Sequence, residues 1–346
     1  MSGDRWQVTG NRLQTTDNRH QTPDNRQPTT DNRNPTTDNR QQTTDNRQPI
    51  PDNRNPTTTT MNHEQAIKEW DLTIEPQRSL FQLNLKDVWR YRDLLGLLVK
   101  RDITAGYKQT ILGPIWMFLQ PLFTTLTFTF VFGNLAGLST DGLPKPLFYM
   151  IGTVAWTYFS DCLTGTAGVF RANAGIFGKV YFPRLIMPLT LVISNLMKFG
   201  IQLTQFIILY VYYVVAKDYS PSVDASLLLL PYLILLMAML GLGLGMIISA
   251  MTTKYRDLSF LLGFGMTLFM YATPVIYPLS AAPEKYKYLL SWNPIAPILE
   301  GFRYIVLGSG TFNWTMLIYT TAVAAITLTI GVLIFNKVEK DFVDTV

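Results

Sequence analysis

Two charged residues, Asp161 and Lys198, stand inside long apolar segments, where their chemistry needs an explanation. An unpaired charge at the centre of a bilayer costs about 2.5 to 3.5 kcal/mol on insertion scales. If the two segments form an antiparallel hairpin that turns near Phe177, the two positions differ by about 7 Å along the helix axes, which a lysine can largely bridge. We therefore hypothesise a buried intramembrane ion pair that pins the hairpin. The alternative is that Lys198 faces a hydrated path and meets an anionic or sugar-bearing substrate.

Two glycine-containing segments look like nucleotide-binding loops but lack the residues that such loops need. In the segment Ala174 to Val180, the residue directly before it, Asn173, stands in place of the first glycine of a phosphate loop. Val180 stands in place of the Ser or Thr that binds magnesium. The GLGLG segment at 241–245 lies within an apolar run with no strand before it. It therefore favours close helix packing through Gly-xxx-Gly over dinucleotide binding.

The remaining reactive residue types form no catalytic or metal-binding constellation. His20 and His63 have no cluster of metal ligands nearby, and Cys162, the only cysteine, cannot form an internal disulfide. A membrane glycosyltransferase would need acidic residues at one membrane face, but Glu284 and Glu300 lie beside basic residues in one connection. We expect a chain that is not an enzyme, with no metal and no cofactor of its own.

Six apolar segments are long enough to cross a bilayer, since about 20 helical residues span a hydrocarbon core of about 30 Å. They cover about 111–136, 147–170, 185–216, 227–251, 258–279 and 314–336. The sequence therefore predicts an all-α membrane protein with six transmembrane helices. Lys and Arg are concentrated in one set of alternate connections, and the positive-inside rule then places both termini in the cytoplasm.

Residues 1–60 form a polar tail in which Asp-Asn-Arg recurs at a regular spacing among Thr, Pro and Gln. No position of the repeat is apolar, which excludes a coiled coil, and such a tail cannot bury enough surface to order itself. We predict that it is disordered, and hypothesise that the native protein begins at Met61. The remainder divides into a cytoplasmic lead and interface helix at 61–110 and a six-span domain at 111–346.

The segment from Asp87 to Ile103 precedes the first apolar run and carries its apolar residues mostly at helical spacing. It is shorter than a span and flanked by basic residues, which predicts an amphipathic helix in the cytoplasmic membrane interface. An ordinary amphipathic core helix is the alternative.

The connection from Leu279 to Phe312 is the longest on the outer side and is unusually apolar and aromatic. It predicts short re-entrant or interfacial helices between the fifth and sixth spans, since irregular backbone at membrane depth must be covered. Glu300 and Arg303 have i, i+3 spacing and could pair. With Trp292 they form a candidate outer gate, and a structural role is the alternative.

On the cytoplasmic side, the connection from Arg171 to Arg184 mixes small, basic and aromatic residues and is too long for a tight turn. This composition suits a short helix that docks into a partner. A plain basic anchor is the alternative.

Three segments in chain order resemble a known family. They are RDITAGYKQTILGPIWMFLQP from Arg101, GKVYFPRLIMP from Gly178 and NPIAPILEGFR from Asn293. Together they are similar to the membrane permease subunits of ABC transporters that export bacterial surface polysaccharides, such as O-antigen, capsular polysaccharide and teichoic acid. The resemblance covers about residues 74–346, and the YKQTILGPIW segment is its most specific part.

The resemblance implies a permease that works as a homodimer with two separate ATPase subunits, which would bind the ATP and magnesium. The loop around Ala172 to Tyr181 would be a coupling helix seated on the ATPase. Its candidate contact residues are Arg171, Asn173, Gly175, Phe177, Lys179 and Tyr181.

The resemblance also implies two kinds of substrate contact. A polyprenyl pyrophosphate headgroup would be attracted at the cytoplasmic lipid boundary, where cationic and hydrogen-bonding groups suit a phosphate. The residues there are Arg101, Tyr107, Lys108 and Gln109. Sugar rings could stack on aromatic side chains in a channel between two copies, for which the candidates are Trp116, Tyr149, Trp156 and Tyr158.

From the residues and the resemblance together, we expect an inner-membrane permease that exports a lipid-linked, O-antigen-like polysaccharide. One alternative is an ABC exporter of a drug or a small lipid. Another is an ion-coupled transporter, which would be expected to show repeated halves with broken helices and more intramembrane carboxylates than Asp161.

Overall fold

The computed structural model describes residues 85–108, 113, 115–177, 182–219, 225–255 and 257–343. These residues all belong to one structural unit, Ile74–Val346. The N-terminal tail and the hypothesised start at Met61 lie outside the described residues, so the expectations about them remain predictions. Within the described ranges every regular element is a helix, which confirms the predicted all-α fold.

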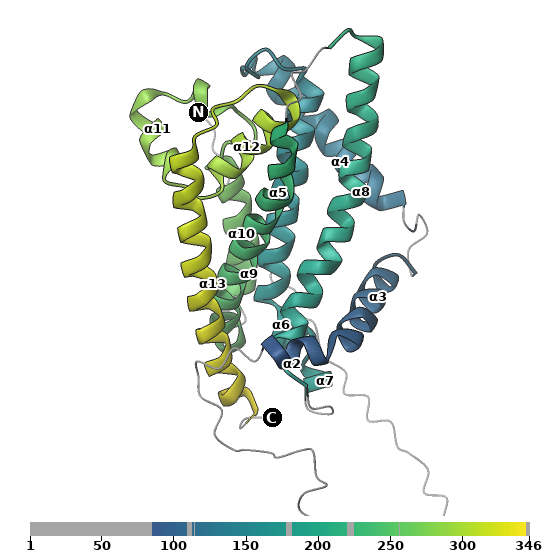
Figure 1. Cartoon of the computed structure of the whole chain (residues 1–346), viewed down its shortest axis with the longest axis vertical. Helices are drawn as coiled ribbons and strands as arrows, with labels where there is room; N and C mark the ends of the chain where they lie inside the picture. Colours follow the sequence, from purple (N-terminus) through teal and green to yellow (C-terminus); the bar gives the residue numbers. More distant parts are fainter. Residues whose placement is uncertain are drawn as a thin grey trace, which may run out of the picture. The chain divides into compact units, whose positions relative to one another are not determined.

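The helices follow one another in chain order with short connections (Figure 1). They are α2 (Leu85–Arg90), α3 (Arg92–Lys108), α4 (Ile115–Phe128), η1 (Thr129–Leu135), α5 (Lys145–Ala167), α6 (Val169–Ala172), α7 (Ala174–Phe177), α8 (Ile186–Ala216), η2 (Ala225–Leu229), α9 (Leu230–Lys254), α10 (Leu258–Tyr271), η3 (Leu279–Ala281), α11 (Glu284–Ser291), α12 (Ala296–Leu307) and α13 (Trp314–Val343).

Four helical segments in the described part of the chain are long and apolar enough to cross a membrane. They are Ile115–Leu135, Ile186–Ala216, Ser226–Lys254 and Trp314–Val338. The other two predicted spans, at 147–170 and 258–279, do not meet both the length and the apolar composition of these four segments. The predicted span at 258–279 is helical only as far as Tyr271, because Thr273 precedes Pro274 and the residue before a proline disfavours the helical conformation. The resulting 14-residue helix α10 is about 21 Å long, shorter than a hydrocarbon core.

Helix α5, the predicted second span, has 23 residues but contains many Thr, Ser, Gly and Tyr residues in addition to Asp161. It packs against α9, α8, α4 and α12, and Figure 1 shows it among these helices. All residues from Leu147 to Trp156 are buried. Because other helices cover it, α5 needs less apolar side chain than a helix whose surface faces lipid.

Glycines allow α9 to approach both α5 and α13 closely. A Cβ built on Gly245 would lie 2.6 Å from the Cβ of Thr166 in α5, and one built on Gly241 would lie 2.8 Å from another α5 side chain. On another side of the helix, a Cβ on Gly243 would lie 2.8 Å from the backbone of Leu328 in α13. The predicted helix packing through Gly-xxx-Gly is therefore confirmed.

Different elements gather at the two ends of the long helices (Figure 1). The short helices α6 and α7 lie at one end, beside α2 and the C-terminal end of α13. At the other end, α11 and α12 occupy the connection between α10 and α13, where short helices were predicted. Helix α12 is almost entirely buried and is capped after Leu307 by Gly308, whose φ of 71° is the left-handed conformation that glycine adopts readily.

The predicted helix at 87–103 is present as two helices, α2 and α3, which are separated at Tyr91. Helix α3 packs against α8, and its Leu98 and Val99 are buried. Leu97 and Trp89 are instead 66% and 71% exposed. The pair of helices therefore has both a packed apolar side and exposed apolar side chains.

The close crossing of α9 and α13 can be tested with alanine substitutions. Gly243→Ala should destabilise the protein, because a methyl group would press on the backbone of Leu328, and overpacking of this kind costs about 1 to 3 kcal/mol. Gly200→Ala in α8 is the matched control, since nothing lies within 4 Å of its Cβ and alanine favours a helix by about 1 kcal/mol. Thermal unfolding midpoints in detergent should fall for the first variant only. Equal midpoints would contradict the close crossing.

Candidate functional site

The α5–α8 hairpin brings the predicted charge pair together. The Nζ of Lys198 lies 3.9 Å from Oδ2 of Asp161. The expectation of a buried pair is corrected, since the two side chains are 47% and 42% exposed. Asp161 lies on the face of α5 that the other described helices leave partly open. No group of three or more His, Cys, Asp or Glu in the described part of the chain could hold a metal ion.

A second ion pair, at the other end of the helices, is fully buried. The Nη1 of Arg303 donates to Oε1 of Glu300 at 3.0 Å, and both side chains are at most 2% exposed. The guanidinium lies 3.9 Å from the centre of the Phe148 ring in α5, and its Nη2 donates to the carbonyl oxygen of Val275 at 2.7 Å. Charge, hydrogen bonds and ring contact therefore tie α12 to α5 and to the segment after α10.

Glu300 extends this attachment to the segments on either side of α11 and α12. Its carboxylate accepts hydrogen bonds from the backbone N–H of Leu279 at 3.2 Å and of Thr311 at 3.3 Å. Trp292, the third predicted gate residue, is separate from this cluster and is 56% exposed. Its carbonyl oxygen accepts a hydrogen bond from the Tyr319 hydroxyl at 3.0 Å. The predicted gate residues thus divide into a buried pair that fixes the connection and an exposed aromatic at its edge.

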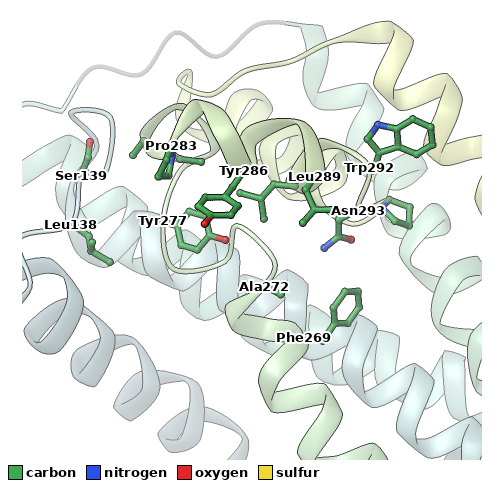
Figure 2. A pocket seen from close by; sticks show the side chains of 14 residues that line it. Leu138, Ser139, Phe269, Ala272, Tyr277, Pro283, Tyr286, Leu289, Trp292 and Asn293 are labelled. Atoms are coloured by element: carbon green, nitrogen blue, oxygen red, sulfur yellow. The ribbon is translucent and has the colours of Figure 1, made fainter.

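Trp292 borders a cavity of about 750 Å³ at this end of the protein. Figure 2 shows Leu138 and Ser139 on one side of the cavity and Trp292 and Phe269 on the other. The lining residues are mostly apolar or aromatic and come from the loop after η1, the end of α10 and the helix α11 with its flanking turns. Sequence reasoning chose only Trp292 among them as a candidate site residue, because the lining comes from segments more than a hundred residues apart and has no local pattern.

A smaller hollow of about 460 Å³ lies on the exposed face of α3. Arg101 and Lys108, two of the predicted headgroup residues, line it together with Lys100 and Leu97. Arg101 also pairs with Asp102 at 2.7 Å. The side chain of Tyr107 and all of Gln109 lie outside the described residues. Lys100, which was not among the predicted site residues, adds a third cation beside the hollow, since positions 97, 100, 101, 104 and 108 share one helix face.

The predicted coupling residues lie partly in α6 and α7, which form the turn between α5 and α8. Arg171 and Gly175 are exposed there, and the Arg171 guanidinium donates to Oγ of Ser259 near the start of α10. The amide of Asn173 donates to the carbonyl oxygen of Val169 at 3.0 Å and stabilises the end of α6. The side chain of Phe177 and the residues Lys179 and Tyr181 lie outside the described residues.

Three of the four predicted channel aromatics are buried inside the chain. Tyr149, Trp156 and Tyr158 are 0%, 6% and 3% exposed, because they lie on the central helix α5. Trp156, for example, packs its ring 5.6 Å from that of Phe269 in α10. Their burial contradicts the expectation that they face sugar rings in a channel between two copies. Trp116 on α4 is 50% exposed and stays available for such a contact.

The contribution of the buried Glu300–Arg303 pair of α12 to stability can be measured, because α11 carries an exposed pair, Glu284–Lys287, with the same spacing. Glu300→Gln should lower the thermal unfolding midpoint strongly, because removing one partner of a buried pair costs about 3 to 5 kcal/mol. Glu284→Gln removes the partner of Lys287, which has the same i, i+3 spacing at 3.4 Å, but Glu284 is 90% exposed. That loss should cost about 0 to 1 kcal/mol. Shifts of the same size in detergent would show that the buried pair does not hold α12 in place.

Comparison with known proteins places these features in one family. The family model described as ABC-2 type transporter matches residues 93–307. The O-antigen export system permease protein RfbA of Klebsiella pneumoniae is 27% identical over 73% of this chain and 94% of its own length. Its Myxococcus xanthus counterpart is 26% identical, with coverages of 76% and 98%. The polysialic acid transport protein KpsM of Escherichia coli is 23% identical, with coverages of 70% and 92%.

The matched range runs from the start of α3 to the last residue of α12. It therefore includes the basic hollow on α3, the Asp161–Lys198 pair and the buried Glu300–Arg303 pair. The relatives confirm the resemblance to polysaccharide-export permeases that three sequence segments indicated. Because the family model covers most of the chain, the chain belongs to the ABC-2 type transporter family.

Proposed function

We propose that this chain is the membrane permease of an ATP-driven exporter that moves a lipid-linked, O-antigen-like polysaccharide across the bacterial inner membrane. The observation that carries the proposal is the match to O-antigen export permeases from two organisms over nearly their whole length. The polysialic acid transporter relative also has a polymeric sugar in its name. These relatives favour a glycan over a drug or a small lipid, and an ATP-driven mechanism over ion coupling.

In this proposal the permease works as a homodimer with two ATPase subunits, which bind the ATP and Mg²⁺. The chain itself catalyses no covalent step. The turn formed by α6 and α7 suits the coupling role, because Arg171 and Gly175 are exposed there and the turn follows α5 directly and precedes α8 in the chain. A rigid-body movement of the ATPase would thereby reach both helices of the hairpin.

We place six crossings in the membrane, with both termini in the cytoplasm. The four long apolar helices supply four of them. Helix α5 would supply the second crossing, since its partner helices replace lipid around it. Helix α10 would enter from the cytoplasmic side, and the buried helix α12 would form a re-entrant segment at the outer side. Its burial supports this, because the non-helical turns that flank a re-entrant helix are stable at membrane depth only where protein or water covers them.

The hollow on α3 fits the pyrophosphate headgroup of a polyprenyl-linked glycan. Lys100, Arg101 and Lys108 border it, and cations at a bilayer surface attract phosphates. Exposed Leu97 and Trp89 would contact the lipid side of the interface. This arrangement would collect the substrate from the cytoplasmic leaflet.

Deletion of the gene tests the proposed function. The deletion strain should lose its surface polysaccharide and accumulate lipid-linked glycan in the cytoplasm, and the intact gene on a plasmid should reverse both effects. Immunoblots of surface glycan and mass spectrometry of extracted lipid-linked glycan measure the two pools. Unchanged surface glycan without intracellular accumulation, in a strain with no second exporter, would reject the proposal.

Charge removal at the hollow tests the headgroup role. Lys108→Gln should reduce the rate of glycan export about tenfold at limiting substrate, because a hydrogen bond to a charged group contributes about 1.5 to 3 kcal/mol. Arg90→Gln removes an exposed cation from α2, outside the hollow, and is the matched control. Both variants should insert in the membrane and bind the ATPase normally. If the two export rates are equal, the hollow does not bind the headgroup.

A further inference from the structure

Helix α5 reverses the usual arrangement of polar and apolar residues on a membrane helix. Between Leu147 and Ala167 every apolar side chain is buried inside the protein. The partly exposed residues of this stretch are Thr157, Ser160, Asp161, Thr164 and Gly165. They fall on one side of the helix, because spacings of three and four residues share a face. A surface that faces lipid would carry the opposite pattern.

Helix α8 supplies polar groups beside this face. Lys198 pairs with Asp161, and Gln202 follows one turn later on the same side of α8 as Lys198. By helical spacing, Ser194 and Gln205 lie on the same side of α8 as Lys198, and their atoms Ser194 Oγ and Gln205 Oε1 are buried and have no hydrogen-bond partner among the described residues. We call Thr157, Ser160, Asp161, Thr164, Lys198 and Gln202 the polar seam.

The polar seam lies too deep for its charges to reach the membrane surface easily. Helix α8 has 31 residues and is therefore about 46 Å long, against a hydrocarbon core of about 30 Å. Lys198 lies about 18 Å from the start of α8, so it is about 10 Å inside the core if the excess length is shared between the ends. An ion pair whose side chains are nearly half exposed in the single chain at this depth requires water, a polar ligand or a second copy of the chain against it.

We propose that the polar seam lines a water-filled path through the membrane and contacts the hydroxyl groups of the passing carbohydrate. Hydroxyl, amide, ammonium and carboxylate groups together offer both donors and acceptors, which matches a chain of sugar hydroxyls. Because the seam remains solvated, water can replace each hydrogen bond between the seam and the carbohydrate, so the seam binds the moving carbohydrate weakly. The carbohydrate part of this inference rests on the proposed function, whereas the presence of water does not.

Cysteine accessibility tests the water-filled path. Cys162 is the only cysteine and is fully buried, so the unmodified chain gives a low background. In membrane vesicles, Ser160→Cys and Thr164→Cys should react with a charged, membrane-impermeant methanethiosulfonate. Ile208→Cys, at an apolar position of α8 that is 66% exposed, is the control. The seam cysteines should react at least about tenfold faster, because the reactive thiolate forms in water and is suppressed in apolar surroundings. Rates equal to that of Ile208→Cys would overturn the proposal.

A second arm identifies what occupies the path. Thr164→Cys should react several-fold more slowly in vesicles from cells that make the lipid-linked glycan than in vesicles from cells that lack it. Equal rates would show that the seam does not contact carbohydrate and would overturn that part of the proposal. A spontaneous disulfide between two copies of Ser160→Cys would also overturn it, because a second chain would then cover the seam. Fast labelling combined with unchanged surface glycan in the deletion strain would reject the proposed function while keeping the hydrated path.

Discussion

A hydrocarbon core offers no hydrogen bonds, and the arrangement of this protein around α5 follows from that constraint. Helix α5 carries too many polar groups to face lipid, so α8, α9 and α4 cover most of it. Glycines on α9 permit the close approach on one side. On the remaining face the polar residues stay partly exposed, with Lys198 beside Asp161. The same helix is therefore both the centre of the packing and the place where polar groups reach the surface.

The two ends of α5 are attached to the two regions that the proposed transport cycle uses. At one end the chain passes directly into α6 and α7, the proposed coupling turn. At the other end Phe148 packs under the guanidinium of Arg303, whose partner Glu300 also binds the flanking backbone. With 23 residues, α5 spans about 34 Å between these attachments. A displacement of the proposed coupling turn would thus reach α12 through one rigid element.

Those features of the fold and of the candidate site that depend on a local sequence pattern could be predicted from the sequence. The offset of Asp161 and Lys198 across a hairpin predicted their contact, and GLGLG predicted the close helix packing, because both depend only on helical spacing. The YKQTILGPIW segment indicated the family. By contrast, the burial of Tyr149, Trp156 and Tyr158 depends on which helix is central, and the cavity beside Trp292 depends on segments distant in the chain. The span predicted from hydropathy also extended beyond Pro274, because the residues after the proline are apolar. The proline nevertheless determines where α10 ends.

The most direct test of the central claim is transport by the purified complex. The permease and its ATPase would be reconstituted in lipid vesicles that contain a lipid-linked glycan, and the movement of the glycan across the bilayer would be measured with a membrane-impermeant glycosidase. The account predicts movement that requires ATP and stops when the ATPase can bind but not hydrolyse ATP. Movement of a drug or a small lipid under the same conditions, with none of the glycan, would contradict it.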